Sequence, residues 1–161
     1  MVPRWLARLI LRLGGWRAVG GMPDLPKCVV VVYPHTSNWD FVWLMRALGG
    51  IPVDRRASHD MVEQMAAQFA ARERLVLALA PEGTRGHVEE WKSGFYHIAR
   101  AADVPVLLAY ADYPTRTGGL GPSIHLTDDV RADMDRIRAF YADKRGKFPE
   151  LMGRIRLKEE A

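Results

Sequence analysis

Residues 28–40 have the sequence CVVVVYPHTSNWD, in which an apolar run leads directly into a polar turn. The β-branched run at residues 28–33 has the length of a buried strand, and Pro34 favours an extended residue before it. A helix is predicted at residues 41–48, after the polar turn. His35 therefore follows the end of a strand, which is where sites lie in open α/β sheets.

His35 and Asp40 are five positions apart, a spacing at which side chains diverge on a continuous helix. They can meet only if His35 lies in the turn and Asp40 in the first helical turn, with Ser37 or Asn38 as the N-cap. An aspartate against one imidazole nitrogen fixes the tautomer, and the other nitrogen can then accept a proton from a hydroxyl. On its own, this spacing favours a surface turn with an aspartate at a helix start.

Further motifs follow in a fixed order. GIPVDR at residues 50–55 contains a short predicted strand at 51–53, and PEGTR at 81–85 follows a predicted strand at 75–80. With the His-x4-Asp block and a looser VPV at 104–106, this set resembles the lysophosphatidic acid acyltransferase family of glycerolipid acyltransferases. The resemblance covers about residues 27–111 and is to a short, bacterial-type member, with a shortened segment after the His-x4-Asp helix.

The resemblance implies an O-acyltransferase that moves a fatty acyl group from an acyl thioester to the hydroxyl of a lysophospholipid such as 1-acyl-glycerol-3-phosphate. In that family the histidine, here His35, is the general base and the aspartate, here Asp40, orients it, with no acyl-enzyme, cofactor or metal. The donor is coenzyme A or acyl carrier protein. A lyso-aminolipid acceptor, a non-catalytic lipid-binding relic and a thioester hydrolase remain open alternatives.

The expected substrate-binding residues come from the second and third motifs. Arg55 and Arg85 offer forked donors for a phosphate, although Arg56 is an alternative to Arg55. Gly83 lets an oxygen approach backbone amides, and Glu82 is placed to orient the acceptor hydroxyl. The full predicted set is Arg55, Glu82, Gly83, Thr84 and Arg85.

The remaining pattern predicts one α/β domain over residues 1–161. The resemblance implies a single mixed sheet flanked by helices, similar to that of glycerol-3-phosphate acyltransferase. The motif-bearing core is residues 27–111. A strand is expected at 105–110 and a short exposed or edge strand at 123–127, with a glycine-rich loop between them at 114–122. Helices are expected at 58–71, 92–102 and 128–141, and a last short helix after residue 150.

Residues 2–13 are predicted to form an amphipathic helix that precedes this domain, within a membrane-binding region at 1–20. Arg4, Arg8 and Arg12 repeat every four residues along one face. The helix is too short and too charged to cross a bilayer, so it predicts either an interfacial anchor or a helix packed on the domain. The interfacial interpretation implies a peripheral protein on the cytoplasmic side of a membrane.

The charge distribution indicates which kinds of partner the protein binds, and the cysteine content limits its disulfides. Four arginines and no acidic residue precede Asp24, and the net charge is +4, which suits an anionic membrane surface or phosphorylated substrates. Motifs typical of nucleic-acid binding are not found. Cys28 is the single cysteine, which excludes an intrachain disulfide. His59 and Glu63 could share a metal, but no second ligand pair supports a site. A homo-oligomer remains open.

Overall fold

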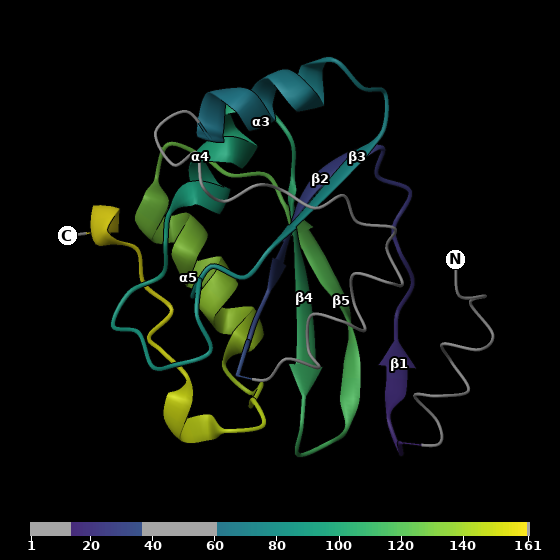
Figure 1. The fold of residues 1–161 in the computed structure, drawn as a ribbon, viewed down its shortest axis with the longest axis vertical. Helices are drawn as coiled ribbons and strands as arrows, with labels where there is room; N and C mark the ends of the chain where they lie inside the picture. Colours follow the sequence, from purple (N-terminus) through teal and green to yellow (C-terminus); the bar gives the residue numbers. More distant parts are fainter. Residues whose placement is uncertain (1–13, 37–60, 161) are drawn as a thin grey trace.

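The computed structural model describes residues 14–36 and 61–160 of the 161-residue chain. Within these residues the strands form one mixed sheet, and three α-helices flank it (Figure 1). The elements in chain order are β1 (Arg17–Val19), β2 (Lys27–Val32), α3 (Met61–Ala70), β3 (Leu75–Leu79), α4 (Gly94–Ala101), β4 (Val106–Asp112), β5 (Thr117–Ile124), α5 (Val130–Tyr141) and the 3-10 turns Pro149–Leu151 and Lys158–Glu160.

The described sheet has the strand order β1-β5-β4-β2-β3. β2 lies between β3 and β4 and is parallel to both, with Val29 opposite Leu77 on one side and Val106 on the other. β5 is antiparallel to β4, and β1 is parallel to β5. The carboxyl ends of β2, β3 and β4 therefore meet at one edge of the sheet, as expected for parallel strands. This topology confirms the predicted single mixed sheet.

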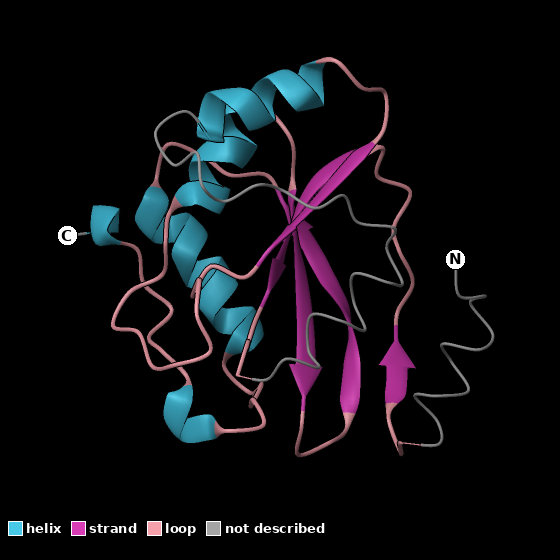
Figure 2. Cartoon of the chain, viewed as in Figure 1, coloured by secondary structure: helices cyan, strands magenta, loops and turns pink. Residues whose placement is uncertain are grey.

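The apolar run of β2 is buried on both faces, which explains why it has no alternation of polar residues. Val29, Val31 and the following Tyr33 pack in the larger core cluster with residues of the three helices. Cys28, Val30 and Val32 belong to a second cluster on the other face, with residues of β4. Figure 2 shows α3, α4 and α5 gathered on one side of the strands.

The three helices occupy ranges close to those predicted. α3 is described from Met61 and buries Phe69, whereas residues 58–60 of its predicted range lie outside the described residues. α4 buries one face through Phe95 and Ile98. Asp129 caps α5, because its carboxylate accepts the backbone N–H of Ala132 at 2.9 Å. The helix predicted at residues 128–141 is thus confirmed, with its start two residues later than expected.

The glycine-rich loop predicted at residues 114–122 is wrong, because Thr117–Ile124 form β5. The predicted strand at 123–127 likewise starts and ends earlier than expected. The physical reason is close strand approach: a Cβ on Gly119 would lie 2.1 Å from the carbonyl oxygen of Val19 in β1. Glycine here permits strand pairing rather than a flexible loop.

Two further boundaries need correction. The amphipathic membrane-binding helix predicted within residues 1–20 cannot extend to residue 20, since Arg17–Val19 form β1. The last helix expected after residue 150 is replaced by two separate 3-10 turns. The predicted elements at 2–13, 41–48 and 51–53 lie outside the described residues. Among the helices that the structure does describe, none has both the length and the apolar character needed to cross a bilayer.

The close approach of β1 to β5 predicts the effect of a methyl group at two neighbouring glycines. Gly119→Ala should lower the free energy of unfolding by about 1–3 kcal/mol, because the new Cβ collides with backbone. Gly118→Ala is the control, since its Cβ would lie 3.4 Å from the carbonyl oxygen of Tyr110, an ordinary contact. Denaturant unfolding measures both variants, and equal stabilities would show that β1 does not press on β5.

Burial also predicts the reactivity of Cys28. Desolvation raises the pKa of this fully buried thiol from 9.0 to about 11. At pH 9 the thiolate should therefore be about 50-fold rarer than in the unfolded chain. The stability that this shift contributes is present below pH 9 and is lost as the pH rises through about 11. Thiol titration at pH 9, with and without denaturant, checks the prediction, and equal rates would contradict it.

Candidate active site

His35 lies in the turn directly after β2, at the edge where the carboxyl ends of the parallel strands meet. The preceding Tyr33–Pro34 peptide bond is cis. Tyr33 and Thr36 are buried on either side of the half-buried His35. The rings of Trp91 and Tyr141 pack against Tyr33, with centroid distances of 5.0 and 5.1 Å. The turn is thus fixed to the core by the residues that flank His35.

Glu82 connects the turn after β3 to the turn after β2. It is only 2% exposed, and its Oε2 accepts the backbone N–H of His35 at 2.8 Å. Its Oε1 accepts the backbone N–H of Gly153 at 3.4 Å. A buried carboxylate is stable only where donors replace water, and two backbone amides supply them here. The first and third motifs therefore converge, and the Glu82 carboxylate is directed toward backbone amides.

The rest of the PEGTR motif forms an exposed turn beside Glu82. Gly83 has a φ of +67° and donates its N–H to the carbonyl oxygen of Ala80 at 3.0 Å. Glycine adopts this left-handed conformation without strain. A Cβ on Gly83 would lie 2.9 Å from Cε of Lys92, so this lysine chain lies against the turn. Thr84 and Arg85 are exposed next to it, and Thr84 Oγ1 accepts the N–H of Gly86 at 3.3 Å.

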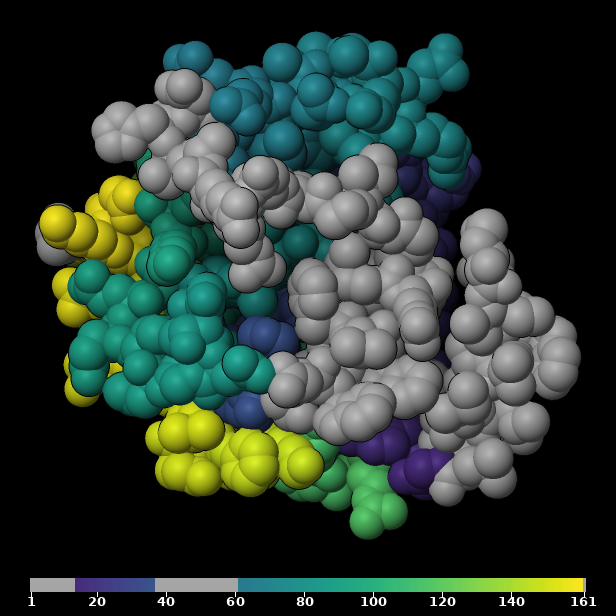
Figure 3. All heavy atoms as spheres, viewed as in Figure 1, coloured from purple at the N-terminus to yellow at the C-terminus, as the bar shows by residue number. Residues whose placement is uncertain are grey.

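The C-terminal segment, residues 146–153, packs against the same turn. In the space-filling view, the residues around the end of β2, up to residue 36 (blue), lie between the loop after β3 (teal) and this segment (yellow) (Figure 3). Phe148 donates its backbone N–H to Thr36 Oγ1 at 3.3 Å. The Tyr33 hydroxyl donates to the carbonyl oxygen of Gly153 at 3.2 Å. Contacts from beyond residue 145 therefore complete the surroundings of His35.

The electrostatics favour a protonated Tyr33. Burial and, to a smaller extent, the nearby Glu82 carboxylate raise the pKa of this phenol to about 12, and Arg145 opposes the shift. The hydroxyl therefore remains a donor to Gly153 across the physiological pH range. At the end of β4, the buried Asp112 accepts the backbone N–H of Arg145 at 2.9 Å, which fixes the start of the C-terminal segment to the sheet.

The predicted site residues are thus placed in part. His35 and Glu82 are in direct contact, and Gly83, Thr84 and Arg85 continue from Glu82 in an exposed turn. Asp40, Arg55 and Arg56 lie outside the described residues. Within residues 14–36 and 61–160, no group of three or more metal-ligating side chains gathers to hold a metal. His125, the residue after β5, is exposed.

Several residues at the site were not predicted from the sequence. Tyr33, Phe148 and Gly153 contact the turn mainly through backbone atoms or a hydroxyl, which no motif marks. Lys92 was expected only as the start of a helix. The one available signal is in the tail, where apolar residues and glycines interrupt the charged sequence at 146–157.

These features define an α/β protein with a histidine-bearing turn and a PEGTR turn at the carboxyl edge of parallel strands. A model of the acyltransferase family matches residues 18–110, more than half of the chain. The chain therefore belongs to the acyltransferase family, as its motifs indicated. Searches of curated proteins and of solved structures found no match. The family match ends within β4, so β5, α5 and the C-terminal segment lie beyond it.

Proposed function

We propose that this acyltransferase moves a fatty acyl group from an acyl thioester to the hydroxyl of a lysophospholipid such as 1-acyl-glycerol-3-phosphate. The observation that carries the proposal is the contact between the His35 turn and the PEGTR turn, in a chain of the acyltransferase family. The backbone N–H of His35 bonds Glu82, and the exposed Arg85 follows three residues after Glu82 in the same turn. That combination suits a base and a phosphate-binding group acting on one substrate.

In this proposal His35 removes the proton from the acceptor hydroxyl while the hydroxyl oxygen attacks the thioester carbonyl. The carbon–sulfur bond then breaks, and the thiol of coenzyme A or acyl carrier protein leaves with a proton. Asp40 orients the imidazole and stabilises its protonated form. The acceptor itself is the nucleophile, so the reaction needs no acyl-enzyme.

Phosphate recognition is assigned to Arg85, with Thr84 and Gly83 beside it, and to Arg55. The Arg85 side chain extends from an exposed turn, and its guanidinium can donate two parallel hydrogen bonds to a phosphate. The neighbouring Lys92 adds positive charge on the same side of Gly83. A lyso-aminolipid is the alternative acceptor. A comparison of turnover with each of the two lipids would distinguish between them.

The lipid acceptor further favours a place at a membrane surface. We infer peripheral binding on the cytoplasmic side, supported by the arginines that precede Asp24 and by the absence of acidic residues there. A cationic segment is attracted to anionic lipids, and the effect weakens as salt rises. The partners in this proposal are an acyl thioester, a lysolipid and an anionic bilayer.

The general-base role predicts that His35→Ala abolishes acyl transfer while the protein stays folded. Asp40→Asn should lower kcat by orders of magnitude, because the imidazole loses its orienting partner. His125→Ala is the matched control, since this exposed histidine follows β5 at the opposite edge of the sheet. The assay follows thiol release from palmitoyl-coenzyme A, and near-normal turnover by the His35 variant would refute the assignment.

The same assay separates the competing functions. Thiol release that requires added 1-acyl-glycerol-3-phosphate supports transfer. Release without any acceptor would instead identify a thioester hydrolase in which His35 activates water. Lipid binding with no release would identify a non-catalytic relative.

Phosphate recognition predicts that Arg85→Ala raises KM for the acceptor about tenfold or more, with a smaller effect on KM for the donor, since a charge-assisted bidentate contact is lost. Arg85→Lys should restore only part of the affinity, because lysine keeps the charge but not the fork. Arg74→Ala is the control: this arginine is 72% exposed and pairs with Asp24 before β3. Equal changes in both KM values would contradict the role.

Arg55→Ala and Arg56→Ala, measured alongside, identify which of the two binds phosphate.

A further inference from the structure

The C-terminal segment contacts the chain on both sides of His35. On one side, Phe148 donates its backbone N–H to Thr36, and a Cβ on Gly146 would lie 2.7 Å from the same Thr36 Oγ1. On the other side, the Tyr33 hydroxyl donates to the carbonyl oxygen of Gly153. The backbone position of His35 is therefore bracketed by two contacts that come from more than 100 residues further along the chain.

The third contact reaches His35 itself through Glu82. The N–H of Gly153 and the N–H of His35 share this one buried carboxylate, one on each oxygen. Movement of Gly153 would remove one of the hydrogen bonds to this buried carboxylate, which is costly. The position of Gly153 and the position of His35 are thus coupled through the Glu82 side chain.

Position 153 also requires a glycine. A Cβ at this position would lie 2.3 Å from the carbonyl oxygen of Val88, which is closer than any real contact. The loop before α4 and the C-terminal segment therefore approach each other backbone to backbone. Any larger residue would push the segment away from Glu82.

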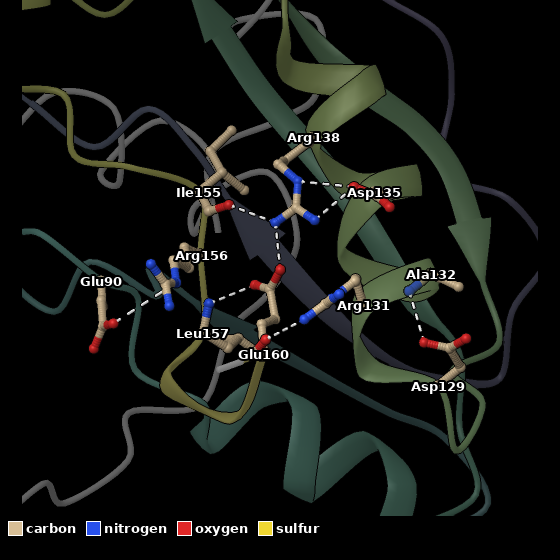
Figure 4. Close-up of polar contacts among 10 residues, drawn as sticks. All are labelled: Glu90, Asp129, Arg131, Ala132, Asp135, Arg138, Ile155, Arg156, Leu157 and Glu160. Carbon is tan, nitrogen blue, oxygen red and sulfur yellow. Dashed lines mark hydrogen bonds and ion pairs between the residues drawn. The ribbon is translucent and has the colours of Figure 1, made fainter.

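Residues 154–160, which follow the C-terminal segment, are held to the fold by contacts of their own. Leu157 is fully buried, and Trp91 donates its backbone N–H to the carbonyl oxygen of Arg156 at 2.8 Å. Arg138 of α5 donates to the carbonyl oxygen of Ile155 at 3.0 Å and to Glu160 at 2.7 Å (Figure 4). These contacts fix the segment to α5 and the core rather than to the site alone.

We propose that the C-terminal segment positions His35 for proton transfer, and that Glu82 is the positioning residue that couples Gly153 to the His35 backbone. The proposal rests on the general-base role of His35 given above. A base must lie within hydrogen-bond reach of the hydroxyl, and an error of about 1 Å can cost about 100-fold in rate. The segment lies outside the matched family region, so this chain supplies the support for its own catalytic turn.

Gly153→Ala in the full-length protein tests the proposal, because it displaces the segment without removing a side chain. We expect kcat for transfer from palmitoyl-coenzyme A to 1-acyl-glycerol-3-phosphate to fall about 10–100-fold, while both KM values change by less than about threefold. Gly94→Ala is the matched control, because a Cβ there meets no atom within 4 Å. An unchanged kcat in Gly153→Ala would overturn the proposal.

A double-mutant cycle separates positioning from general destabilisation. Glu82→Gln keeps the shape of the side chain but has only one acceptor oxygen, so it cannot accept both amides. If the two changes act through one contact, the double variant loses little more activity than the worse single variant. Losses that multiply would show that Gly153 does not act through Glu82. Should Gly153→Ala fail to fold, Tyr33→Phe removes the other contact with Gly153, and a kcat equal to the parent protein would then overturn the proposal.

Hydrogen exchange of the His35 amide provides a readout that does not require activity. Loss of its bond to Glu82 should speed exchange at this amide in Gly153→Ala, with no change in Gly94→Ala. Unchanged exchange at His35 overturns the positioning role, even in a protein without acyl transfer. Transfer that persists in His35→Ala, with altered exchange in Gly153→Ala, would instead refute the general-base function alone.

Discussion

A carboxylate that is removed from water must find hydrogen-bond donors, and Glu82 finds them in the backbone amides of His35 and Gly153. This requirement joins the turn after β2, the turn after β3 and the C-terminal segment at one point. Loss of either amide would remove a hydrogen bond to a buried charged group, and such a bond contributes about 1.5–3 kcal/mol. The local geometry of the candidate site follows from this constraint.

The sheet brings the two turns close enough for that contact. β2 pairs in parallel with β3 and β4, so the chain leaves all three strands at the same edge. Burial on both faces requires a continuous apolar β2, and the first polar residues therefore occur where the strand ends. β5 and β1 extend the sheet on the far side of β4, away from β3. Strand pairing and residue polarity thus lead to the same edge for the site.

The sequence was sufficient to predict the parts of the fold that depend on side-chain pattern. The buried strand at residues 28–33, the helix predicted at 128–141 and the position of His35 after a strand end follow from strand burial and side-chain periodicity. Features that depend on how closely two backbone segments approach each other could not be predicted in this way. Gly119 suggested a loop, although its lack of a Cβ is what allows β1 to approach β5. Composition alone cannot distinguish a flexible glycine from a closely packed one.

The contacts of the C-terminal segment show a related limit. Phe148 contributes only its backbone N–H to Thr36, while its side chain is 40% exposed. Gly153 contributes a backbone N–H and a carbonyl, so among these contacts only the close approach to Val88 restricts the residue type. Backbone groups of this kind are carried by almost every residue, so they leave no signature in a sequence. The tail therefore contacts the His35 turn mainly through groups that do not depend on residue type, and only the geometry of the folded chain identifies these contacts.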